Sequence, residues 1–93
     1  MKLRFTEDSS HTSFTYGKWY DILTIREYKN TNTFSANRII RDFNEFDIDS
    51  FINEDKYFEA SLYNDGGELE YVELCHFNVI EVFRSYVIDN VLK

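Results

Sequence analysis

The chain has 93 residues, a length that predicts one domain over residues 1–93 with a single core. An aromatic share of 18% without any proline excludes a disordered chain, and the lone Cys75 excludes an internal disulfide framework and fits a reducing cytoplasm. The net charge of −7 argues against direct nucleic-acid binding, because phosphate backbones repel an acidic surface.

The first third of the chain predicts two strands. Leu3 and Phe5 alternate with polar neighbours, which is typical of a short strand. After a polar stretch, the aromatic and β-branched residues of 18–28 predict a second strand that is covered on both faces. The N-terminus lacks the apolar core of a signal peptide, and no apolar run is long enough to span a membrane. We therefore expect a cytoplasmic protein without membrane contact.

Residues 30–56 predict an inserted segment whose conformation the sequence leaves open. Four apolar residues have helical spacing, namely Ile39, Ile40, Phe43 and Phe46. Ser35 is a suitable N-cap for such a helix, whereas the Thr-, Asn- and Phe-rich flanks favour an extended chain. The stretch 47–54 suits a short turn of helix.

Residues 57–74 predict a β-hairpin. Two runs of alternating apolar and polar residues flank Asn64-Asp65-Gly66-Gly67, whose residue types tolerate the positive φ of a tight two-residue turn. Along the second run, Glu68 and Glu70 share one face, and Glu73 breaks that alternation. The hairpin is the strongest local signal in the chain.

The C-terminal part predicts a turn, a strand and a helix. Residues 74–78 suit a tight turn with Phe77 tucked inward, and the apolar run 79–83 reads as a strand. The apolar spacing over 85–93 favours a short C-terminal helix.

Two patterns resemble those of small SH3-like barrel proteins of phage and prophage origin. One is Phe14-Thr15-Tyr16-Gly17-Lys18-Trp19-Tyr20, and the other is the turn 64–68 followed by Val72, Phe77 and Val79. The resemblance covers about half of the chain and implies a mainly β fold with minor α, a partly open SH3-like barrel with a segment inserted at about 30–56. Such barrels host many unrelated activities, so the resemblance implies no particular function.

No residue pattern predicts catalysis or a cofactor. Cys75 and His76 are adjacent, but neighbours on a strand point to opposite faces, so we interpret Cys75 as packed and His76 as a surface residue. His11 has no catalytic partner near it in sequence. The acids of 47–55 lack the central glycine and the spacing of a calcium loop. We expect a protein that is not an enzyme and holds no metal.

Acidic residues concentrate in residues 42–73, where eleven acids face one lysine for a net charge of −10. Such a field attracts basic partners, although acids also serve solubility alone. The favoured hypothesis is a small acidic interaction protein of phage type, a DNA mimic that binds and inhibits a larger host or defence protein through its basic surface. The predicted contact acids are Asp42, Glu45, Asp47, Asp49, Glu59, Glu68, Glu70 and Glu73.

Aromatic residues support an alternative hypothesis, a peptide-binding or self-assembling homo-oligomeric module. Trp19 either belongs to the core or lines a recognition groove, and Tyr63 is a second predicted contact. Salt separates the two hypotheses, because acidic contacts weaken steeply as ionic strength rises and aromatic contacts do not.

Overall fold

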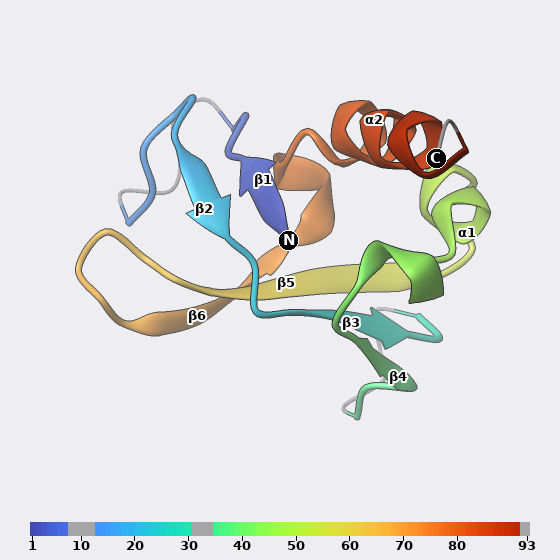
Figure 1. The fold of residues 1–93 in the computed structure, drawn as a ribbon. Helices are drawn as coiled ribbons and strands as arrows, with labels where there is room; N and C mark the ends of the chain where they lie inside the picture. The colour runs from blue at the N-terminus through green and yellow to red at the C-terminus, as the bar shows by residue number, and fades with distance from the viewer. Residues whose placement is uncertain (8–12, 31–34, 92–93) are drawn as a thin grey trace.

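The computed structural model describes residues 1–7, 13–30 and 35–91 of the chain (Figure 1). Within these residues the fold is mainly β, with six strands in two antiparallel sheets and minor helix, as the sequence predicts. His11 and residues 31–34 of the predicted insertion lie outside the described residues. No helix in the described part of the chain combines the length and apolar character that crossing a membrane requires.

The smaller sheet pairs β1 with β2, and the larger sheet has the order β4-β3-β5-β6. The strands are β1 (Lys2–Arg4), β2 (Trp19–Asp21), β3 (Thr24–Tyr28), β4 (Arg38–Ile40), β5 (Tyr57–Tyr63) and β6 (Leu69–Glu73). In Figure 1, β1 and β2 lie on the same side of the larger sheet as the helices. The two sheets do not close into a barrel, so the partly open arrangement is confirmed.

The strand predicted over residues 18–28 is divided between the two sheets. Its backbone changes partner at Ile22 and Leu23: the Ile22 N–H donates to the Met1 carbonyl at 2.7 Å, and the Leu23 N–H donates to the Ser61 carbonyl at 2.8 Å. Inward and outward positions exchange at the same point, because Tyr20 is buried before the bend and Ile25 is buried after it. The bend joins the two sheets.

The inserted segment combines a strand with two short helical turns. Of the two conformations left open for the stretch from Ile39 to Phe46, the extended one holds at residues 38–40, which form β4 and pair with β3. The segment continues with η1 (Phe43–Glu45), a 3₁₀ turn, and α1 (Ile48–Ile52), which confirms the helical turn predicted over 47–54. Pairing with a neighbouring strand outweighed local helical spacing at Ile39.

The chain ends in η2 (Leu74–His76) and α2 (Val79–Val91). The turn and the buried Phe77 are confirmed, but the strand predicted over 79–83 is wrong, since α2 begins at Val79. Asn78 explains the start of the helix: its carbonyl accepts the Val82 N–H at 3.2 Å, and its side-chain oxygen accepts the Arg4 N–H at 2.8 Å. The helix is thereby tied to β1.

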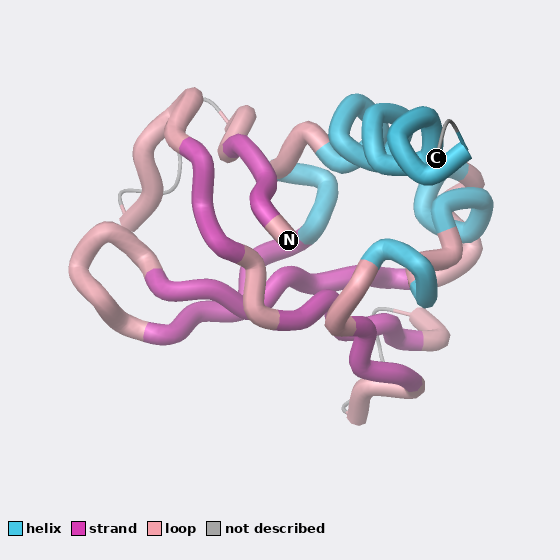
Figure 2. Tube along the Cα trace, in the orientation of Figure 1, coloured by secondary structure: helices cyan, strands magenta, loops and turns pink. Residues whose placement is uncertain are grey.

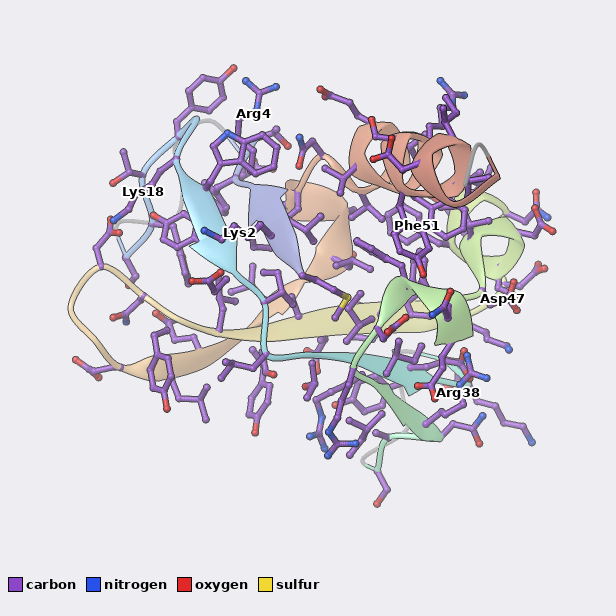
Figure 3. All side chains as sticks on the ribbon, viewed as in Figure 1. Lys2, Arg4, Lys18, Arg38, Asp47 and Phe51 are labelled. Carbon is purple, nitrogen blue, oxygen red and sulfur yellow. The ribbon has the colours of Figure 1, made fainter. Side chains whose placement is uncertain are left out.

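Figure 2 shows the helices on one side of the larger sheet. Aromatic side chains from both layers form the core between them. The Phe46 ring lies 5.2 Å from the ring of Phe58 on β5 and 6.0 Å from the ring of Phe83 on α2. Phe51 reaches from α1 toward this core beneath α2 (Figure 3). Most of the inward face of the sheet is therefore used for packing, which leaves the opposite face for other roles.

The β5–β6 hairpin is confirmed, but its turn has three central residues in place of two. Asn64 N–H donates to the Glu68 carbonyl at 2.8 Å, and Gly67 N–H donates to the Asn64 carbonyl at 3.0 Å. Gly67 has φ +82°, the left-handed conformation that closes a three-residue hairpin loop. The turn residues predicted from the sequence are confirmed, but the loop is one residue longer than the predicted two-residue turn.

Candidate functional site

The face of the larger sheet opposite the core carries acids and exposed aromatic residues together. On β5, Ala60 and Leu62 are buried, so the alternate residues point to the other face. The strand register places the neighbouring residues of β6 on that same face. Where these two strands pair with each other, the outward residues are Glu59, Ser61, Tyr63, Leu69, Tyr71 and Glu73.

Three of these residues, Tyr63, Leu69 and Tyr71, form what we call the outer patch. Tyr63 lies directly opposite Leu69, and Tyr71 is the next outward residue of β6. Their exposed fractions are 55%, 49% and 54%, which is unusual for three adjacent large side chains of a small domain. The Arg26 guanidinium lies 5.1 Å from the Tyr71 ring centroid and borders the patch on β3.

Acids occupy the other half of the outer face. Glu59 and Glu73 are direct cross-strand partners, and like charges at such positions repel each other. Arg26 is the partner of Glu59 on β3. The Tyr57 hydroxyl donates to Glu59 at 3.2 Å, and desolvation together with the Glu59 charge raises the pKa of Tyr57 to about 12. The outer face thus joins an apolar half to a charged half that holds two acids and Arg26.

The predicted acids of the inserted segment divide into two kinds. Asp42 and Asp47 cap η1 and α1: Asp42 accepts the Asn44 N–H at 2.6 Å, and Asp47 accepts the Ser50 N–H at 3.1 Å. The bonds from Ser50 lower the pKa of Asp47. The other two acids, Glu45 and Asp49, are exposed. Half of this predicted contact set therefore has a structural role.

The remaining hairpin acids do not join Glu59 and Glu73. Glu68 is exposed on the turn, and Glu70 lies opposite Leu62 and accepts a hydrogen bond from the Asn64 side chain at 2.6 Å. Of the eight predicted contact acids, Glu59 and Glu73 are the pair that the register places side by side. The outer face could be found from sequence only by knowing which face of the hairpin is buried.

Trp19 is 51% exposed, so its interpretation as a core residue is wrong; Tyr20 occupies the buried position. Trp19 lies on β2 opposite Arg4, in the smaller sheet, and Tyr63 lies on the larger sheet. The two predicted aromatic contacts therefore belong to different sheets.

The hairpin turn is held to the N-terminal part of the chain by Asp65. Its carboxylate accepts hydrogen bonds from the Thr15 hydroxyl at 2.7 Å, from Lys18 Nζ at 2.8 Å and from the Tyr20 hydroxyl at 2.9 Å. Figure 3 shows Lys18 beside the tip of the hairpin. These bonds, that of Lys18 first, lower the pKa of Asp65 to about 2. The outer patch is therefore presented by a hairpin with a fixed end.

A buried carboxylate organises the opposite end of the sheet. Glu27 is 2% exposed, and its carboxylate lies 3.6 Å from Lys56 Nζ and 3.8 Å from the Arg38 guanidinium. Lys56 also reaches Asp47 at 3.4 Å, and Arg38 donates to the carbonyl oxygen of Glu45. Figure 3 shows Arg38 and Asp47 at this end. The cluster ties β3 to the inserted segment, which supplies Arg38, Asp47 and Lys56.

The turn η2 corrects the interpretation of Cys75 and His76. Cys75 is exposed and His76 is half-buried, the reverse of the predicted arrangement. Because residues 74–76 form a 3₁₀ turn and not a strand, one donor atom each from Glu73, Cys75 and His76 lie within 4.8 Å of one another. Desolvation, followed by the charge of Glu73, raises the pKa of the Cys75 thiol to about 11.

Glu73 and Cys75 also line an open cleft of about 900 Å³ between the end of β6, the start of β5 and the first turn of α2. Lysines and acids share its wall: Lys29 and Lys56 stand with Glu54, Asp55 and Glu81. The cleft has mixed charge and gives solvent access to the Cys75 turn.

Comparison of the chain with protein-family models, curated proteins and solved structures finds no match. The resemblance to SH3-like barrels therefore stays a prediction, and a function has to be argued from the surfaces described above.

Proposed function

We propose that this chain is a non-catalytic interaction protein that binds a basic surface of a larger protein through the outer face of its four-stranded sheet. One observation carries the proposal: Glu59 and Glu73 lie on the same face as the half-exposed outer patch of Tyr63, Leu69 and Tyr71. Aromatic side chains supply contact energy when they are buried at an interface, and neighbouring acids select a basic partner.

The charge distribution supports the basic character of the partner. Residues 42–73 carry a net charge of −10, and Glu45, Asp49 and Glu68 are exposed acids of that stretch. A field of this sign speeds the approach of a positively charged protein. A protein that binds nucleic acid has a basic surface, and occupying that surface would inhibit the protein.

The second candidate is self-assembly or peptide binding through the outer patch alone. It is favoured by the exposure of Tyr63, Leu69 and Tyr71 as one contiguous group on two paired strands. In this case the acids serve solubility, and association shows little dependence on salt.

Two matched double variants separate these functions. Glu59→Lys with Glu68→Lys reverses charge next to the outer patch, and Tyr63→Ser with Tyr71→Ser removes aromatic area from it. The wild-type protein is used to capture its partner from nuclease-treated extract of its source cells, and association and dissociation rates are then measured with the purified partner at low and high salt. We expect charge reversal to slow association about tenfold or more at low salt. The serine variant should mainly speed dissociation.

The control is Glu45→Lys with Asp49→Lys, which makes the same charge change on the inserted segment. It should weaken association less than the variant beside the patch. Equal binding by all three variants, or binding that does not change with salt, would contradict the acidic contact. A concentration-dependent dimer by light scattering that Tyr63→Ser with Tyr71→Ser abolishes would favour self-assembly.

A further inference from the structure

We propose that Glu73, Cys75 and His76 bind one divalent transition-metal ion of the zinc type, with Glu7 orienting the histidine. Glu73 also belongs to the outer face of the proposed interaction function, but the inference is argued from the donor cluster and not from that function. It starts from the 3₁₀ turn η2, which places a carboxylate oxygen, a thiol sulfur and an imidazole nitrogen within 4.8 Å of one another at the surface.

The donor set matches the chemistry of zinc. Cysteine sulfur, histidine nitrogen and carboxylate oxygen are the three protein ligands that Zn²⁺ uses, at about 2.0–2.3 Å. Tetrahedral ligands at these lengths stand about 3.3–3.7 Å apart, so the donors have to close by roughly 1 Å. Glu73 and Cys75 are exposed, and rotation of their side chains supplies that movement without a change in the core.

Glu7 provides an observation independent of the donor cluster. Its carboxylate lies 2.8 Å from His76 Nδ1, and His76 Nε2 lies 4.0 Å from the Glu73 carboxylate. Metal-binding histidines characteristically donate their second ring nitrogen to a carboxylate, which fixes the tautomer and the ring orientation. The contact of Nδ1 with Glu7 favours the tautomer with its proton on Nδ1, so Nε2, 4.0 Å from the Glu73 carboxylate, is the nitrogen that would bind the ion.

The position of the turn gives the ion a route and an open coordination site. Glu73 and Cys75 line the open cleft, so a hydrated ion reaches them from solvent. Three protein ligands leave a fourth tetrahedral position for water. On binding, the Cys75 thiol loses its proton to solvent and coordinates as the thiolate.

The test uses the metal-free chain with a phosphine reductant, titrated with Co²⁺ and then with Zn²⁺. We expect one ion per chain by calorimetry, together with a sulfur-to-cobalt absorption band that Zn²⁺ displaces. Cys75→Ser should abolish the band, and His76→Ala and Glu73→Gln should lower affinity by more than the about 10–100-fold that loss of an outer carboxylate costs. Circular dichroism of each metal-free variant verifies that the fold is kept.

Glu7→Ala tests the positioning role. It should weaken binding by about 10–100-fold and keep the sulfur-to-cobalt band, because the ligands themselves remain. The matched controls are His11→Ala, which removes the other histidine of the chain, and Glu68→Gln, which removes an acid of the same hairpin. Both should bind as the wild-type protein does. Absence of the band overturns the site. Wild-type affinity in Cys75→Ser or in His76→Ala overturns it as well.

Discussion

The two ends of the larger sheet are both held by a carboxylate, but in different surroundings. At one end Glu27 is buried, and its nearest cationic nitrogens lie 3.6 and 3.8 Å away. At the other end the Asp65 side chain is 32% exposed and accepts three hydrogen bonds of 2.7 to 2.9 Å. One carboxylate is shielded from water by the fold, and the other is held by short, direct bonds.

This difference separates what each carboxylate contributes to stability. A buried charge has lost its hydration and depends on its partners, so removal of those partners is costly. A partly exposed charge recovers hydration when its partners are lost, and its contribution therefore depends more on pH and less on packing. The number of acids in a sequence therefore says little about how much a buried or a partly exposed carboxylate contributes to stability.

The largest effect is expected when Glu27 loses its cations. Arg38→Met with Lys56→Met leaves the carboxylate buried without a cation, with the Asn37 amide at 3.4 Å, and the free energy of unfolding should fall by about 3–5 kcal/mol. Chemical denaturation measures this loss.

The control adds Glu27→Gln to the same background. An amide needs no counter-charge, so the triple variant should recover most of the lost stability. A triple variant that is no more stable than the double variant would mean that the loss comes from packing of Arg38 and Lys56 and not from the charge of Glu27.

A smaller effect is expected at the hairpin tip. Asp65→Asn removes the charge that Lys18, Thr15 and Tyr20 share. We expect a loss of about 1–2 kcal/mol at neutral pH, because hydrogen bonds to a charged group contribute about 1.5–3 kcal/mol and partial exposure reduces that contribution. Thermal and urea unfolding measure it.

The sign of the pH dependence follows from the direction of the Asp65 shift. Its pKa falls from 3.8 to about 2 in the folded protein, so its contribution is complete above about pH 3.8 and disappears as pH falls through about 2. The difference in stability between wild type and Asp65→Asn should therefore shrink over that interval. A difference that stays constant down to about pH 2 would contradict this assignment.

The smallest effect is expected at the exposed pair Lys2–Asp21. Its atoms lie 3.8 Å apart, and both side chains are more than 70% exposed, at 72% and 77%. Lys2→Gln should change the free energy of unfolding by at most about 1 kcal/mol. A loss as large as that of Asp65→Asn would mean that exposure does not rank these three carboxylates.

The hairpin could be predicted from sequence because its turn residues, Asn64 to Gly67, act locally. The prediction of a strand over residues 79–83 is wrong because a five-residue apolar run is compatible with either a strand or a helix. The distant contact of Asn78 with Arg4 decided in favour of the helix. The division of the strand at Ile22 could not be predicted either, since its cause is a change of partner from Met1 to Ser61.

The candidate surfaces were predicted only in part. The acids were found, but their grouping depends on register: Glu59 meets Glu73, whereas Glu70 faces Leu62. Residues predicted to point apart, Cys75 and His76, come together because the chain turns at η2. Side-chain direction changes with local conformation, so a site built on a turn is hidden from reasoning that assumes a strand.

β6 is the last strand in the order of the larger sheet, and among the described strands it is hydrogen-bonded to β5 alone. Its sequence, Leu-Glu-Tyr-Val-Glu, combines strand-forming residues with a charge at Glu70 and at Glu73. An outermost strand of this kind invites pairing with the same strand of another molecule, and charges placed along it repel that neighbour. These two carboxylates therefore oppose edge-to-edge association of the protein, and replacing both with uncharged residues would remove that protection.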